Sequence, residues 1–184
     1  MTKRIQRITP PIALMNRAAA GSSAAQFKLA ELYMQSEHED DIELAEEWAL
    51  KAAQLGLVEA MYWLGEGYTA YAKDLRESDP EESKTYFEYA HNWLKQAAEQ
   101  KHAAATLELA GFYRRGDVVQ QDTLKSIELV EQAAKLGDVQ AMRDIAFIYA
   151  NGLGIDANEE KADFWTAKAE TIEPTITQPQ IDSE

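Results

Sequence analysis

The hydrophobic pattern of the chain repeats four times. Each copy starts from a small or linking residue, at Gly21, Gly56, Lys101 and Gly137. Four positions later comes an alanine, eight positions later an aliphatic residue, nine positions later an alanine or glycine, and twelve positions later a tyrosine. Because these spacings lie on one face of a helix, each copy predicts a helix whose small residues let another helix come close. We call it helix A.

A second amphipathic segment, helix B, follows each tyrosine. The four segments read AEEWALKAA (45–53), AHNWLKQAA (90–98), SIELVEQAA (126–134) and ADFWTAKAE (162–170). One slot is shared by Trp48, Trp93 and Trp165 and is taken by Leu129 in the third copy. Apolar residues three, seven and eight positions apart predict an amphipathic helix, with the tryptophan slot in the core.

The ends of the B helices carry their own signals. Gly56 and Gly137 are expected to stop the B helices of the first and third copies. Asp41, Asp122 and Asn158 are the expected N-caps, because their side chains can accept from free backbone N–H groups.

A helix pair of 35 or 36 residues cannot bury its apolar face alone and must stack on its neighbours. We therefore predict an all-α superhelix, or α-solenoid, of about four helix pairs. The expected segments are a basic leader with a partial capping helix at 1–20, repeats at about 21–55, 56–100, 101–136 and 137–170, and a disordered tail at 171–184.

The second copy is longer than the others and contains no glycine loop. Asp79 as N-cap, Pro80 at the first helical position and Glu82 predict an early start for its helix B. The hairpin at about residues 69–90 should then project beyond the array. Its aromatic residues, Tyr71, Tyr86, Phe87 and Tyr89, favour either packing within the hairpin or a binding surface. Both interpretations stay open at this point.

The repeated unit reads A-x-x-x-L-G/A-x-x-Y-x-x-G-x-G-V/I-x-x-D/N-x-x-K-A-x-x-W-x-x-K-A. It resembles the Sel1-like repeats, which are related to tetratricopeptide repeats. The fourth copy matches nearly throughout, the third departs at Val118 and Leu129, and the first lacks the glycine loop. The resemblance covers about residues 21–170. It implies a scaffold or adaptor for protein–protein interactions, of which bacterial members often act in envelope, signalling or host-interaction roles.

Composition narrows the function further. The 184 residues include no cysteine, which excludes a disulfide framework and a thiolate metal site. The formal net charge is −14, and acidity of this degree argues against nucleic-acid binding. No apolar run approaches the ~20 residues of a membrane span, and the N-terminal apolar stretch is too short for a secretory signal. We expect a cytoplasmic protein without membrane insertion.

The sequence contains only weak signals of a catalytic or metal-binding site. The pairs Glu88/His91 and Glu99/His102 are 11 residues apart, about 16 Å along a helix, which is too far for a two-metal site. His38, in an acidic stretch, is expected to be solvated. No Gly-x-Ser-x-Gly or His-Glu-x-x-His motif is present. We therefore expect no catalytic residue, no metal and no cofactor, and a protein that is not an enzyme.

The resemblance also implies where a partner would bind. Helix-pair solenoids bind through the concave surface lined by their A helices. Projecting the tetratricopeptide groove positions nominates Phe27, Glu31, Tyr62, Glu66, Leu107, Arg114, Arg115, Arg143 and Phe147. The predicted function is a monomeric scaffold or adaptor that binds a peptide or partner protein in this groove. The alternatives are a regulatory subunit or undetected enzyme on a helical framework, and an oligomer formed by end-to-end stacking.

Overall fold

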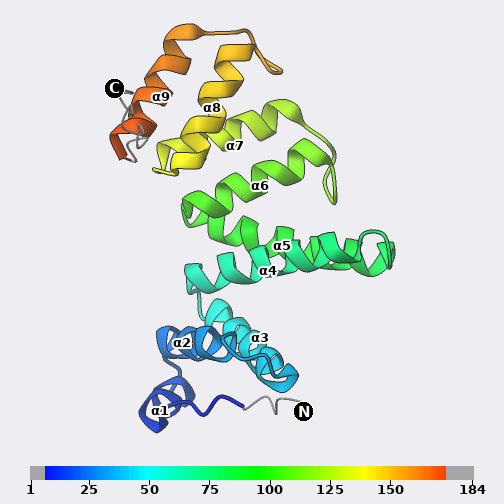
Figure 1. The fold of residues 1–184 in the computed structure, drawn as a ribbon, viewed down its shortest axis with the longest axis vertical. Helices are drawn as coiled ribbons and strands as arrows, with labels where there is room; N and C mark the ends of the chain where they lie inside the picture. The colour runs from blue at the N-terminus through cyan, green and yellow to red at the C-terminus, as the bar shows by residue number, and fades with distance from the viewer. Residues whose placement is uncertain (1–6, 173–184) are drawn as a thin grey trace, which may run out of the picture. The chain divides into compact units, whose positions relative to one another are not determined.

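The computed structural model describes residues 7–172, and within them the chain forms α-helices and no strands (Figure 1). The helices are α1 (Ile12–Ala19), α2 (Ser23–Tyr33), α3 (Glu39–Gln54), α4 (Val58–Leu75), α5 (Pro80–Glu99), α6 (Ala103–Arg115), α7 (Thr123–Lys135), α8 (Val139–Asn151) and α9 (Glu159–Ile172). The predicted all-α repeat fold is confirmed: α2, α4, α6 and α8 are the A helices, and α3, α5, α7 and α9 are the B helices. Lys3 and Arg4 of the leader, and the predicted tail beyond Ile172, lie outside the described residues.

The chain divides into two compact units, residues 1–109 and 110–184, and the division falls inside α6. In the first unit α1 packs on α2, α2 on α3, α3 on α4, and α4 on α5. In the second unit α7 packs on α8, and α8 on α9. Within each unit these helices therefore contact their neighbours in sequence, as expected for stacked hairpins.

The repeated small and aliphatic positions form the core of both units. Ala60, Ala105 and Ala141, four positions into their repeats, are completely buried. Leu129 and Trp165 of the B-helix slot are also buried, whereas Trp48 and Trp93 are half-buried. The slot thus lies in the core as predicted, but two of its three tryptophans keep an edge in solvent.

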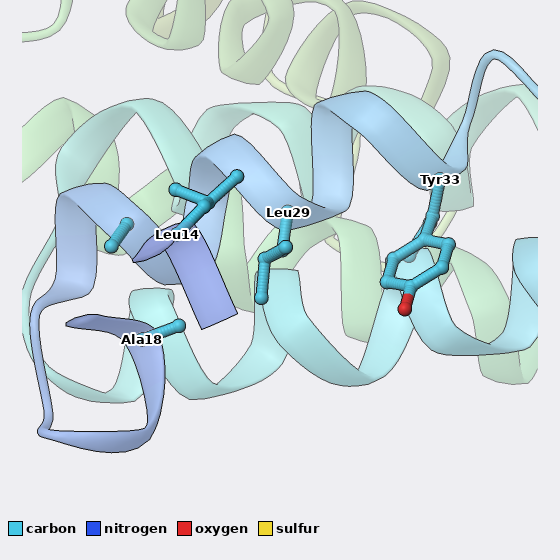
Figure 2. Close-up of a cluster of buried hydrophobic side chains, with 6 residues drawn as sticks. Leu14, Ala18, Leu29 and Tyr33 are labelled. Carbon is cyan, nitrogen blue, oxygen red and sulfur yellow. The ribbon is translucent and has the colours of Figure 1, made fainter. Parts of the chain in front are cut away.

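The first core cluster joins α1, α2 and α3. Leu14 and Ala18 from α1 lie against Leu29 and Tyr33 from α2, and Figure 2 shows these four side chains together. Trp48 of α3 borders the cluster. Helix α1 covers the exposed side of the first repeat, which is the capping role that the sequence predicted for this segment.

The prediction that Asp41 caps the first B helix is wrong. Asp41 is not the N-cap of α3, which begins at Glu39 after His38. Instead its side chain is completely buried, and its carboxylate accepts from the Ile8 backbone N–H at 2.8 Å and from Arg7 Nε at 3.2 Å. In the first turn of α3 the carboxylate lies where the helix dipole favours an anion. It ties the segment before α1 to α3.

These donors explain the acidity of Asp41. The bond from the Ile8 N–H, with smaller contributions from Ser36 and Arg7, holds the pKa of Asp41 below its usual range, although burial acts in the opposite direction. A buried carboxylate is stable only when such donors satisfy it.

The turns between repeats confirm the glycine and cap predictions. Gly56 and Gly137 have φ of 87° and 104°, a left-handed conformation that costs little only for glycine. Lys101 takes the same place after α5 with φ of 65°. Asp122 and Asn158 accept from the N–H groups of Lys125 and Lys161, at 2.8 and 2.9 Å, and so cap their helices.

The long hairpin of the second repeat is present as predicted. Helix α4 ends seven residues after Tyr68, whereas α6 and α8 end two residues after their tyrosines. Asp79 caps α5 by accepting from the Glu82 N–H at 3.0 Å, with Pro80 at the first position. Figure 1 shows α4 and α5 side by side as long antiparallel helices.

Helices α4 and α5 approach closely at Gly65, so Gly65→Ala should destabilise the protein. The new methyl would lie 2.5 Å from Leu94 Cγ, and overpacking of this kind costs about 1–3 kcal/mol. Gly67→Ala is the matched control, because no atom lies within 4 Å of the added carbon, and it should stabilise α4 by about 0.5–1 kcal/mol. Urea unfolding should show that the free energy of unfolding falls for Gly65→Ala and rises for Gly67→Ala, relative to wild type. A change in the same direction for both variants would contradict the close approach of the two helices.

Replacing Lys101 by glycine should stabilise the first unit. The left-handed conformation costs a side-chain-bearing residue about 1–2 kcal/mol, so Lys101→Gly should gain about 1 kcal/mol. Lys101→Ala removes the same charge but keeps the strain, and should gain nothing. Thermal unfolding of both variants measures the difference, and an equal gain from alanine would show that the charge, not the backbone, was responsible.

The stability supplied by Asp41 should depend on pH. Because the fold lowers its pKa, the contribution is full above the unfolded value of about 3.9 and is lost as the pH falls through the folded value. Asp41→Asn should therefore be less stable than wild type at pH 7, and the gap should shrink below about pH 4. Asp40→Asn, an exposed partner of Arg7, should cost no more than about 0.5 kcal/mol. Urea unfolding across pH 3–7 tests this, and a constant gap would refute it.

Candidate partner-binding surfaces

The nine residues nominated from the sequence are divided between the two units. Five belong to the first unit, namely Phe27, Glu31, Tyr62, Glu66 and Leu107. Four belong to the second, namely Arg114, Arg115, Arg143 and Phe147. Each set is described within its own unit.

In the first unit two of the nominated rings contact the next repeat. Phe27 of α2 meets Trp63 of α4 edge-on, with ring centroids 6.4 Å apart. Tyr62, at the same repeat position, stacks on His102 at 4.6 Å. Both rings are half-buried. This position therefore helps to join consecutive repeats.

His102 also has a structural role. Its Nδ1 accepts from the Ala105 N–H at 3.1 Å at the start of α6. The spacing of the Glu-x-x-His pairs argues against a two-metal site that includes this histidine, and the structure places it, half-buried, at a helix cap.

The other three residues of the first unit differ in exposure. Glu31 is half-buried and pairs with Lys28 at 2.9 Å on the same helix. Glu66 is exposed, and Leu107 is half-buried. Among the five, Glu66 is the most accessible to a partner.

In the second unit the two arginines at the end of α6 differ. Arg114 is exposed. Arg115 pairs with Asp117, at 2.6 Å between Nε and Oδ2, and its guanidinium lies over the ring of Phe112 at 5.6 Å. The charge of Arg115 is thus compensated within the loop that follows α6.

Arg143 and Phe147 line an open groove between α8 and α9 with a volume of about 430 Å³. Phe147 is 62% exposed, a high value for a phenylalanine in a helix. The lining residues are Arg143, Ala146, Phe147, Ala150, Ala162, Asp163, Thr166, Ala169 and Glu170. The groove therefore combines an apolar floor with one cation and two carboxylates.

The first repeat shows what covers the equivalent surface. There α4 packs against α3, Phe27 at the Arg143 position meets Trp63 of α4, and Ala49 and Ala53 are completely or almost completely buried. The matching residues of α9 are Thr166 and Glu170, both exposed. These two positions are polar in the fourth repeat and alanine in the first, a difference that a projection of A helices alone missed.

The long hairpin carries a cluster of four tyrosines, Tyr68, Tyr71, Tyr86 and Tyr89. The rings of Tyr71 and Tyr86 are 4.6 Å apart, those of Tyr68 and Tyr86 5.7 Å, and those of Tyr68 and Tyr89 5.9 Å. Packing within the hairpin thus accounts for part of its aromatic content, but Tyr71 and Tyr89 remain 47% and 51% exposed.

A carboxylate borders this tyrosine cluster. The Tyr68 hydroxyl donates to Glu46 Oε1 of α3 at 2.5 Å. Burial and this bond raise the pKa of Tyr68 well above that of a free tyrosine, and burial also raises the pKa of Tyr86. Both phenols therefore keep their protons at neutral pH.

Between residues 7 and 172, no three His, Asp or Glu side chains are arranged to hold a metal ion. No helix in the same range is both long enough and apolar enough to span a membrane.

Comparison with known proteins matches the repeats one by one. The Sel1 repeat family matches at residues 23–57, 58–102, 103–138 and 139–170. The Sel1-repeat-containing protein YjcO of Escherichia coli K12 is 28% identical over 165 residues, which are 88% of this chain and 66% of YjcO. YjcO of Shigella flexneri, described as uncharacterized, gives the same values. The chain thus spans less than two thirds of the length of these relatives.

A solved structure agrees with these matches. The crystal structure of a Sel1 repeat protein from Oxalobacter formigenes superposes with a TM-score of 0.71 at 27% identity, covering 87% of this chain and 62% of that one. Four matched repeats, a shared fold and the repeated alanine, tyrosine and tryptophan positions lead to one conclusion: the chain belongs to the Sel1 repeat family.

Proposed function

We propose that the protein is an interaction module that binds a partner protein, and that its principal binding site is the groove between α8 and α9. Sel1 repeats generally serve as scaffolds for protein–protein interactions. The observation that carries the proposal is the exposed Phe147 in a groove of about 430 Å³, whose α9 wall carries Thr166 and Glu170 where the first repeat has the buried Ala49 and Ala53.

The shape and chemistry of the groove suit an amphipathic helix. In the first repeat the equivalent surface receives α4, so the spacing of the walls is suited to a helix. Ala146, Ala150 and Ala169 leave room for apolar side chains of the partner. Amphipathic helices commonly bind in such grooves through residues spaced three and four apart.

Charge would orient the partner. Arg143 lies on α8, and Asp163 and Glu170 lie on α9, so the two walls carry opposite charge. A helix with acidic residues on one side and basic residues on the other would bind in one direction. Complementary charges of this kind contribute more to specificity than to affinity.

The remaining nominated residues are proposed as partner contacts of their own units, Arg114 and Arg115 in the second unit and Phe27, Glu31, Tyr62, Glu66 and Leu107, separately, in the first. Arg114 and Glu66 are exposed and accessible. Phe27, Tyr62, Arg115 and Glu31 make contacts within the chain, so they would present an ordered surface to a partner. Ordered side chains lose little entropy when a partner binds.

A second copy of the chain is the alternative occupant. Phe164 and Ile172 of α9 are 58% and 50% exposed, so the last repeat presents apolar surface beyond the groove. End-to-end stacking would cover such a surface and would give an oligomer. Sedimentation of the purified protein distinguishes this case, because a monomer is expected under the proposal.

Phe147→Ser should abolish partner capture while leaving the fold intact. Loss of a buried aromatic anchor weakens binding at least about tenfold, or about 1.4 kcal/mol. Phe164→Ser is the matched control, because Phe164 is similarly exposed on the adjacent helix but does not line the groove.

The measurement has two stages. Quantitative affinity capture from the native lysate, with wild type and both variants as baits, identifies proteins lost only with Phe147→Ser. Titration of one such protein against the three purified chains then gives the dissociation constants. The proposal fails when both variants retain the same proteins as wild type, or when both lose the same ones.

A further inference from the structure

The tyrosine cluster on the long hairpin suggests a second binding surface, independent of the α8/α9 groove and located in the other unit. It comprises Tyr68 and Tyr71 of α4 and Tyr86 and Tyr89 of α5. Two of the rings are about half exposed, and Tyr86 lies edge-on to both Tyr71 and Tyr89 at interplanar angles of 82° and 89°. Such an arrangement offers ring faces in several directions.

In the fourth repeat the equivalent tyrosine is paired with a cation, whereas the first repeat has Leu44 in the matching position of its B helix. Tyr149, the counterpart of Tyr68, has the ammonium of Lys161 over its ring at 4.6 Å. Lys161 also donates to the Tyr149 hydroxyl at 3.2 Å, and that hydroxyl lies 3.3 Å from Glu131 of α7. The repeat therefore builds a site in which a tyrosine ring, a glutamate and a lysine ammonium meet.

The third repeat keeps the same lysine. Lys125 precedes its core residue Leu129 by four positions, as Lys161 precedes Trp165, and it interacts electrostatically with Tyr113. Lys125 itself pairs with Glu128 at 2.9 Å, so it is in the fourth repeat that the chain supplies its own cation to the ring of the repeated tyrosine.

In the second repeat this lysine is replaced by Tyr89. Four positions before Trp93 the chain has a tyrosine, whose ring lies 5.9 Å from that of Tyr68. A tyrosine and a glutamate still meet here, because Tyr68 bonds to Glu46, which lies one helical turn away from the position that matches Glu131. The substitution removes the internal cation from this slot and adds another aromatic ring.

The surrounding charge is negative. Glu46 of α3 and Glu82 of α5 both act electrostatically on Tyr86. The faces of aromatic rings attract cations, and a neighbouring carboxylate strengthens that attraction. The surface is thus complementary to a positive side chain in both shape and charge.

We propose that the tyrosine cluster, together with Glu46, is a docking site for an arginine or lysine side chain from a basic segment of a partner protein. The incoming cation takes the place of the lysine that the fourth repeat provides internally. The extended hairpin presents the site, since α4 and α5 run beyond the length of the later helix pairs.

A labelled peptide with the sequence (Gly-Ser-Arg)₄ tests the proposal, alongside the same peptide with neutral citrulline at each arginine. Fluorescence anisotropy at about 0.15 M salt should show the arginine peptide binding about tenfold more tightly. Equal affinity for the two peptides, or no binding of either, would overturn the proposal.

Tyr89→Lys is the decisive variant, because it restores the internal cation found at Lys161 and should fill the site. It should weaken binding of the arginine peptide about fivefold or more. Gln96→Lys adds the same charge to an exposed position about 10 Å further along α5 and should weaken binding less than about twofold. Equal weakening by both variants would show only a general attraction to an acidic surface, and would refute the site.

If circular dichroism shows that Tyr89→Lys alters the fold, the affinity of the arginine peptide for a second variant, Tyr71→Ala, tests the same site. Tyr71 is 47% exposed, so its truncation should leave the helices intact while weakening the arginine peptide about threefold or more. Unchanged affinity would contradict the proposal. Phe147→Ser should leave peptide affinity unchanged, which separates this surface from the α8/α9 groove.

Discussion

The close approach of neighbouring helices at alanine and glycine is the constraint on which this structure depends. The alanine near the start of each A helix is buried in every repeat, and in the second repeat a glycine faces Leu94 with no room for a methyl group. At such distances the helices gain many weak dispersion contacts, and a larger side chain would push them apart. This requirement explains why small residues recur at the same positions of each repeat in the sequence.

The tyrosines that recur in each repeat form a second link between consecutive repeats. Tyr68 bonds to Glu46, and the Tyr149 hydroxyl lies beside Glu131; in each case the glutamate comes from the B helix of the preceding repeat. A buried phenol needs a hydrogen-bond partner, and an acidic residue on the neighbouring helix supplies it. Polar contacts thus fix the register in which the small residues meet.

The described repeats end differently at their two sides. At the start, α1 and the buried Asp41 cover the first helix pair, so its apolar face is closed by the chain itself. At the far side, Phe147 and Ala150 are exposed, and Thr166 and Glu170 stand where the first repeat has buried alanines. Polar substitution at the edge of a repeat array lowers the cost of exposing it. It also leaves a mixed surface suited to a protein partner.

The sequence by itself determined the repeat, the fold class, the long hairpin and the helix caps at Asp79, Asp122 and Asn158. These features depend on spacing along one chain and on local backbone chemistry, which a sequence displays directly. The burial of Asp41 required the tertiary structure, because two of its donors, Arg7 and the Ile8 N–H, lie more than 30 residues away and no local rule brings them to it. The groove residues from α9, and the meeting of four tyrosines with Glu46, were likewise decided by packing between helices. Side chains from separate helices share a surface only after the small residues have set the distance between them.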